Sequence, residues 1–92
     1  MKLVWTRTAI RDLIGIRRYI GHDNPMAAQE VASRIVNAVN KLGKHPESGR
    51  IGRVPYTREL VVSGTPYLVP YRIRSKRIEL LRVLHGRQEW PK

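Results

Sequence analysis

The chain has 92 residues, too few for two independent cores, and it carries 18 Lys and Arg against 7 Asp and Glu, a formal net charge of +11. A chain this small buries only about 60% of its unfolded surface, which favours a stabilising partner. The positive charge favours an anionic partner, either nucleic acid or an acidic protein surface, with anionic lipid as the weakest of the three candidates. No apolar run approaches the roughly 20 residues that span a bilayer, and the absence of cysteine excludes disulfides and Cys-rich zinc sites. We expect a single domain over residues 1–92, no membrane association and, since the first residues lack a signal-peptide pattern, a cytoplasmic location.

Two amphipathic helices are predicted after a short strand at residues 3–5. Thr6 is a suitable N-cap for a helix over residues 7–21, and Asn24 and Pro25 suit the start of a second helix that runs to about residue 42. Apolar residues recur at helical spacing in both segments and predict their buried faces. The first face holds Ala9, Leu13, Ile16 and Ile20, and the second holds Ala28, Val31, Ile35, Ala38, Val39 and Leu42.

Three strands are predicted in the second half, after a loop rich in Pro and Gly over residues 44–56. They cover residues 57–62, 67–73 and 78–84, with turn-like connections between them. The fold class is therefore α+β: a short N-terminal strand, an αα-hairpin, then a three-stranded antiparallel meander. We expect the helices on one sheet face and basic loops around the other, open face.

A small set of side chains in this meander has the chemistry of a metal-free nuclease. Arg58 and Arg82 lie inside predicted strands and offer guanidinium groups to phosphate, and His85 ends the last strand, where it could act as general acid or base. Glu59 or Glu89 would be a poorer second base. The alternative is structural, with the arginines in solvent and His85 bonded to a backbone carbonyl. His22 and His45 have no ligand-spaced partners, so we expect no metal, and no cofactor motif is present.

The order and spacing of several segments resemble the RelE/ParE superfamily of bacterial toxins over roughly residues 3–91. The segments are 57–62 (TRELVV), 66–73 (PYLVPYRI) and 78–87 (IELLRVLHGR), preceded by an Ala-x-x-Asp-Leu-x-x-Ile helix at Ala9, by Asn24-Pro25 and by His45-Pro46. The resemblance implies a β-α-α-β-β-β toxin of a type II toxin–antitoxin system. It also implies a hetero-oligomer with a cognate antitoxin, whose acidic or flexible segment wraps the toxin.

The superfamily has two branches, RelE-like and ParE-like, and the sequence of the middle strand helps to distinguish them. RelE-like members cleave messenger RNA on the ribosome and commonly carry Tyr-Arg-Leu-Val-Tyr on the middle strand of the meander. Here that run is Tyr67-Leu68-Val69-Pro70-Tyr71, with Leu68 at the position of the phosphate-binding Arg. This favours the ParE-like branch, which inhibits DNA gyrase.

Three functions therefore remain open. The favoured one is a gyrase inhibitor, with target contacts expected at Arg82, His85, Arg87 and Trp90. The alternative is a metal-independent endoribonuclease acting through Arg58, Arg82 and His85. The third is a non-toxic basic module that binds nucleic acid.

Overall fold

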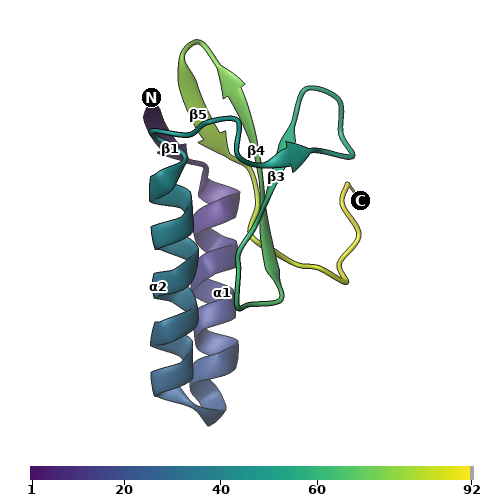
Figure 1. Cartoon of the computed structure of the whole chain (residues 1–92). Helices are drawn as coiled ribbons and strands as arrows, with labels where there is room; N and C mark the ends of the chain where they lie inside the picture. The colour runs from purple at the N-terminus through teal and green to yellow at the C-terminus, as the bar shows by residue number, and fades with distance from the viewer. Residues whose placement is uncertain (92) are drawn as a thin grey trace.

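The computed structural model describes residues 1–91, and within them two helices pack on one side of a six-stranded sheet (Figure 1). The helices are α1 (Arg7–Asp23) and α2 (Pro25–Lys41). The strands are β1 (Lys2–Trp5), β2 (Arg50–Ile51), β3 (Arg58–Val61), β4 (Tyr67–Arg74), β5 (Arg77–Leu80) and β6 (Leu84–His85). The expected α+β class is confirmed.

The helical hairpin begins and turns where the capping residues predict. The Thr6 hydroxyl accepts a hydrogen bond from the Ala9 amide at 3.2 Å, and the Asn24 side chain accepts one from the Ala27 amide at 3.1 Å. The first helix continues two residues beyond the expected end at Gly21, because the Asn24 amide still donates to the Ile20 carbonyl at 2.9 Å. The two helices are therefore joined by a single residue.

The expected meander is confirmed as β3, β4 and β5, which pair antiparallel in that order. Two further strands extend the sheet. β1 lies parallel to β5 at one edge, and the short β2 pairs with β3 at the other, which gives the order β1-β5-β4-β3-β2. The N-terminal strand thus joins the same sheet as the C-terminal half of the chain.

The last strand differs from the prediction of one continuous strand over residues 78–84. It is split into β5 and β6, with residues 81–83 outside both, so that three residues oppose Val69 and Pro70 of β4. The Leu81 amide donates to the Pro70 carbonyl at 2.8 Å, but proline has no N–H to complete the pair. The result is a bulge. Arg82 was expected inside a strand and lies in this bulge instead.

The core lies between the helices and the sheet, and the predicted helix faces contribute to it. Its buried members are Ala9, Ile35, Val39, Leu42, Val62, Tyr67, Val69, Tyr71, Ile78, Leu80 and Val83. The expectation of an open opposite face is wrong at the centre of the sheet, where Leu68, Pro70 and Leu84 are buried. The segment after β6 runs on this side of the sheet, away from the helices (Figure 1).

Candidate functional site

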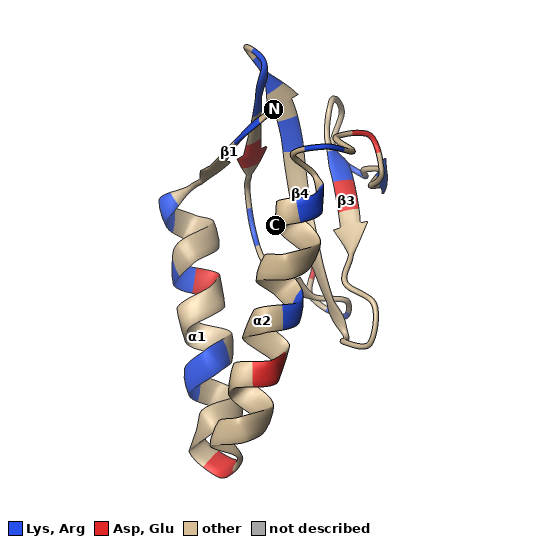
Figure 2. Cartoon of the chain, turned by 60° about the vertical axis from the view of Figure 1, so that its left-hand side comes forward, with Lys and Arg blue, Asp and Glu red and all other residues tan. Residues whose placement is uncertain are grey.

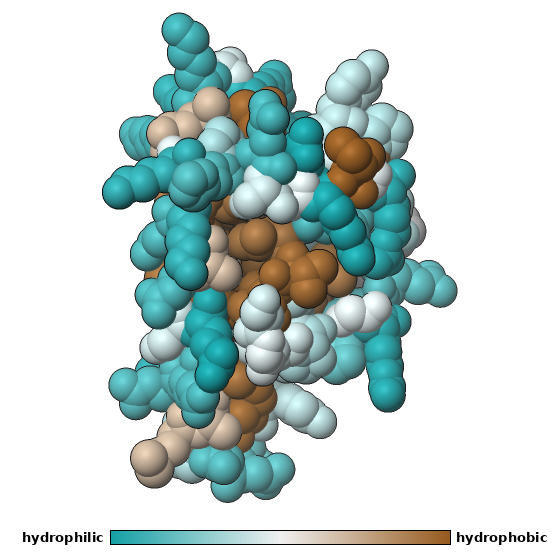
Figure 3. Space-filling view, viewed as in Figure 1, coloured by the Kyte–Doolittle hydropathy of each residue, from teal (hydrophilic) through white to brown (hydrophobic). Residues whose placement is uncertain are grey.

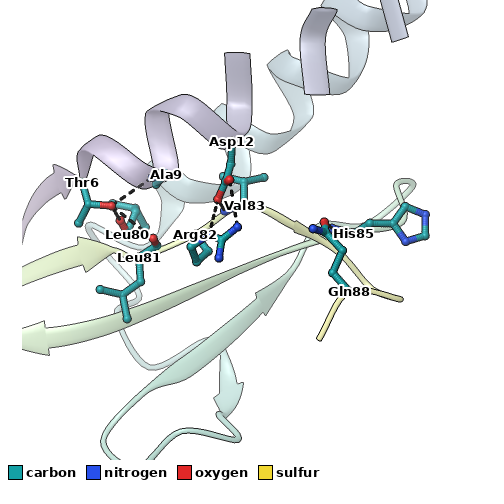
Figure 4. Close-up of polar contacts among 9 residues, drawn as sticks. All are labelled: Thr6, Ala9, Asp12, Leu80, Leu81, Arg82, Val83, His85 and Gln88. Carbon is teal, nitrogen blue, oxygen red and sulfur yellow. Dashed lines mark hydrogen bonds and ion pairs between the residues drawn. The ribbon is translucent and has the colours of Figure 1, made fainter. Parts of the chain in front are cut away.

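Arg82 is held by Asp12 of α1, as Figure 4 shows. Its Nε lies 2.7 Å from Asp12 Oδ2 and its Nη2 lies 3.2 Å from Oδ1, and the Val83 amide donates to the same Oδ2 at 2.9 Å. The two side chains are only 20% and 17% exposed. The hydrogen bond to Asp12 raises the pKa of Arg82, whose guanidinium therefore remains charged. One carboxylate thus fixes both the bulge and its arginine to α1.

His85 follows this bulge and is fixed by its own backbone and ring. Its amide donates to the Gln88 side chain at 2.8 Å, and its Nδ1 accepts from the Arg87 amide at 3.1 Å. The ring contacts Tyr67 edge to face at 5.7 Å between centroids, and it points away from the Asp12–Arg82 pair (Figure 4). Because Nδ1 is an acceptor, the neutral ring carries its proton on Nε2 and offers a donor there.

Arg58 is not brought together with His85. It lies on β3 opposite Tyr71, whereas His85 lies on β6 opposite Tyr67, on the other side of β4 and about 13 Å further along that strand. The Arg58 Nη1 donates to the Gly49 and Glu47 carbonyls at 2.8 and 3.3 Å. Leu68, at 6% exposure, lies in the central strand at the position where the resemblance predicts a phosphate-binding arginine. The three candidate nuclease residues therefore occupy three separate environments.

Glu59, named as a possible second base, is enclosed by arginines. It is 1% exposed and accepts hydrogen bonds from Arg50 Nη2 and from the Arg53 amide, both at 3.1 Å, while Arg53 Nε lies 3.5 Å away. Burial opposes its ionisation, but the Arg53 amide, the Arg50 side chain and both positive charges together hold the pKa of Glu59 below its ordinary value. Glu89, the other possibility, is exposed near the end of the chain.

The segment from Gly86 to Pro91 carries the remaining expected target contacts. Its start is fixed by the Gly86 amide, which donates to the Pro66 carbonyl at 2.8 Å. Arg87 is exposed. The Trp90 side chain is half-buried, and its Nε1 is buried without a hydrogen-bond partner among residues 1–91. The sequence did not reveal that Asp12 organises this end of the chain, because the two partners are 70 positions apart.

A groove of about 440 Å³ lies between α2 and β3. Apolar surface gathers in the hollow between the helices and the sheet (Figure 3). The groove is lined by Arg34, Asn37, Ala38, Lys41, His45, Ser48, Leu60, Val61, Val62 and Ser63. Over residues 1–91 no three His, Asp or Glu side chains lie close enough to hold a metal ion. No helix in the same range is long and apolar enough to cross a bilayer.

Comparisons with known proteins agree with the expected family. Residues 3–90 match the family described as "ParE toxin of type II toxin-antitoxin system, parDE". "Putative toxin Y4kP" of Sinorhizobium fredii is 48% identical over 98% of this chain and 93% of its own length. "Toxin RelE2" of Caulobacter vibrioides is 39% identical over 92% and 94%. The solved structure "Chromosomal ParDE TA system from P. aeruginosa" superposes with a TM-score of 0.85 and 32% identity, covering 92% of this chain and 95% of that one. The chain belongs to the ParE toxin family of type II toxin–antitoxin systems.

Proposed function

We propose that this toxin acts by inhibiting DNA gyrase and that a cognate antitoxin neutralises it. The observation that carries the proposal is Leu68, which is buried in the central strand where a nuclease would offer an arginine to the scissile phosphate. Removing one such transition-state interaction costs an enzyme roughly 100- to 1,000-fold in rate. The separation of Arg58 from His85 on opposite sides of β4 supports the same view.

The gyrase contact is proposed at the C-terminal segment, with distinct roles for its residues. His85 and Arg87 provide a donor at Nε2 and an exposed guanidinium. Arg82 acts as a positioning residue, because Asp12 occupies its guanidinium. Trp90 is half-buried, and its Nε1, which has no hydrogen-bond partner among residues 1–91, is proposed to donate to an acceptor on the target.

The antitoxin is proposed to occupy the groove between α2 and β3. The groove is lined by apolar side chains and by Lys41 and Arg34, and these cations suit acidic side chains, with Arg34 also paired to Glu30 at 3.2 Å. β2 ends its pairing at Glu59, so the strand edge at Val61 has no neighbour among residues 1–91, and Val61 is 52% exposed. The Val62 amide donates to the Tyr67 carbonyl of β4. Because successive residues of a strand direct their backbone groups to opposite edges, the Val61 amide and carbonyl point to that free edge. An extended acidic segment could therefore add a strand there.

The test is a plasmid supercoiling assay with purified gyrase and the full chain, beside an assay of messenger RNA cleavage on translating ribosomes. We expect supercoiling to be inhibited and transcripts to stay intact. His85→Ala and Arg87→Ala should each weaken inhibition at least tenfold, while Arg18→Ala, an exposed arginine on α1, should leave it unchanged. Inhibition that persists in both variants would contradict the proposed contact, and unaffected gyrase would contradict the proposed target.

The alternative is a ribosome-dependent endoribonuclease, and one observation favours it. The His85 Nε2–H could protonate a leaving oxygen as a general acid. A metal-free mechanism would also need a base, and Glu59 is held ionised among arginines without access to His85. Transcript cleavage within reading frames, abolished in His85→Ala, would support this function. Salt-dependent nucleic-acid binding without growth arrest would support the third possibility, a non-toxic binding module.

A further inference from the structure

The loop between β2 and β3 exposes an aromatic ring that the fold does not use. Tyr56 is 97% exposed and adopts φ +65°, in the left-handed region where an L side chain is strained. It follows Pro55 in a turn closed by the Thr57 amide, which donates to the Val54 carbonyl at 3.2 Å. Glycine would be the ordinary residue at this position. Neither the turn nor the core therefore requires the Tyr56 ring.

The loop that carries this ring is firmly built. Buried Glu59 binds Arg50 and the Arg53 amide, and the Gly52 amide donates to the Thr57 carbonyl at 2.9 Å. A Cβ on Gly52 would lie 2.3 Å from Thr57 Oγ1, so the two sides of the loop are in close contact. The exposed ring is thus presented by a fixed scaffold, in which little ordering entropy would be lost on binding.

A pocket of about 310 Å³ adjoins Tyr56. It is lined by Ile51, Tyr56, Thr57, Arg58, Arg72 and Ile73. Ile51 is 76% exposed, so its side chain also lacks cover in the free protein. Arg58 donates to carbonyls and has no carboxylate within 4.0 Å among the described residues. The pocket therefore combines apolar and aromatic side chains with one guanidinium, that of Arg58, that has no carboxylate partner, beside Arg72, which is paired with Glu79.

Positive charge continues from this pocket along the β4–β5 hairpin, where blue marks the strands and the tip in Figure 2. Residues 50–59 and 72–79 together hold seven Lys and Arg but only two carboxylates, Glu59 and Glu79. Arg74 and Arg77 face each other across the hairpin, a like-charge pair that weakens strand pairing. The tip residues Ser75 and Lys76 both have positive φ, at 51° and 58°. By strand alternation Arg72, Arg74 and Arg77 share the sheet face away from the helices, whereas Arg58, opposite the core residue Tyr71, lies on the other face and adjoins Arg72 at the pocket.

We propose that this surface, the Tyr56 patch (Ile51, Tyr56, Arg58, Arg72, Arg74 and Arg77), binds single-stranded nucleic acid. Tyr56 would stack on an unpaired base beside the pocket. Arg74 and Arg77, which have no carboxylate within 4.0 Å among the described residues, would contact the phosphates that follow, while Arg72 is already paired with Glu79. Bases present a flat face to an aromatic ring whatever their sequence, and guanidinium groups bind phosphate in bidentate geometry. An acidic peptide would satisfy the charges but would leave the exposed ring without a matching flat partner.

The test is fluorescence anisotropy of labelled 15-mer oligo-dT and oligo-U titrated with the full chain at several salt concentrations. Tyr56→Gly suits the left-handed position and removes only the ring. We expect this variant to bind roughly 5- to 150-fold more weakly, which corresponds to the loss of one stacked base. Tyr19→Ala, which removes an 81% exposed tyrosine of α1, is the matched control and should bind like the wild type.

The proposed phosphate contacts are tested by the double variant Arg74→Gln with Arg77→Gln, which also removes the repulsion between these two arginines. The logarithm of the affinity falls as the logarithm of the salt concentration rises, and the magnitude of this slope should decrease by about 0.7 for each phosphate that the variant no longer neutralises. Arg11→Gln with Arg18→Gln on α1 removes the same charge away from the patch and should leave the slope unchanged. The two oligonucleotides distinguish DNA from RNA as the preferred strand.

Two results would overturn the proposal. One is equal affinity of the wild type and Tyr56→Gly for both oligonucleotides, with thermal unfolding confirming that the variant folds. The other is a poly-glutamate peptide of the same charge that competes as well as oligo-dT and loses the same affinity in Tyr56→Gly, which would assign the surface to acidic protein. Gyrase is absent from these measurements, so their outcome is independent of the proposed target.

Discussion

Two irregular segments, the loop between β2 and β3 and the bulge between β5 and β6, are each fixed by a carboxylate with similar chemistry. Asp12 accepts two hydrogen bonds from Arg82 and one from the Val83 amide. Glu59 accepts from the Arg50 side chain and from the Arg53 amide. In both segments one carboxylate, fully buried at Glu59 and partly buried at Asp12, binds an arginine and a backbone amide of the irregular chain.

The two interactions differ in range and therefore in what they stabilise. Glu59 binds residues six and nine positions away and organises one loop. Asp12 binds residues 70 and 71 positions away and joins α1 to the C-terminal segment. A local interaction mainly orders a loop, whereas a long-range one forms only when the whole fold does. The Asp12 interaction should therefore contribute more to global stability.

The largest effect is expected for Asp12→Ala. It would leave the Arg82 guanidinium partly buried without a partner and would deprive the Val83 amide of its acceptor. Loss of one partner from such a pair costs about 3 kcal/mol, or a fall of roughly 12–24 °C in Tm for a chain of this size. The measurement is urea and thermal unfolding by circular dichroism. Glu30→Ala, which breaks an exposed pair with Arg34, is the control and should cost under about 0.5 kcal/mol. Equal destabilisation in both variants would mean that the Asp12–Arg82 pair contributes no more to stability than an exposed ion pair.

Much of the fold could be predicted because its signals are local. The helical hairpin follows from the spacing of apolar residues and from the capping residues Asn24 and Pro25, and each of these signals lies within a few positions along the chain. The bulge also had a local signal, because Pro70 cannot donate within a central strand, yet a continuous partner strand was expected there. The Asp12–Arg82 pair had none, since neither residue type nor spacing indicates a partner 70 positions away. The candidate site depends on that pair, and for this reason it was less predictable than the fold.

Gly52→Ala tests how closely the two sides of the loop between β2 and β3 are packed. The added methyl would lie 2.3 Å from Thr57 Oγ1 and 3.0 Å from the Thr57 backbone. Forcing these atoms apart should cost about 1–3 kcal/mol. Hydrogen exchange should show faster exchange at the Gly52 and Thr57 amides and little change at Val83. Equal protection of the loop in variant and wild type would mean that the backbone can accommodate the methyl group.

Glu59→Gln should cost about 1–2 kcal/mol at pH 7, since its arginine partners are half-exposed and screened by solvent. The pKa of Glu59 is lowered on folding from an ordinary value of 4.5, so its contribution is complete above that pH. The contribution is lost as the pH falls through the lowered pKa. The difference in unfolding free energy between wild type and variant should therefore be largest near neutrality and shrink below about pH 4.5. A difference that grows in acid would contradict this assignment.

The smallest effect, and one of opposite sign, is expected for Tyr56→Gly. The variant relieves a positive φ but gives the unfolded chain more freedom, and these two effects are each about 1 kcal/mol. The ring is exposed, so no packing is lost. Unfolding in urea should show a stability between unchanged and about 1 kcal/mol higher. A decrease of more than about 1 kcal/mol would mean that the ring supports the loop. An unchanged or higher stability would mean that the loop carries a side chain its own folding does not need, in contrast to the C-terminal segment, where the bulge depends on Asp12.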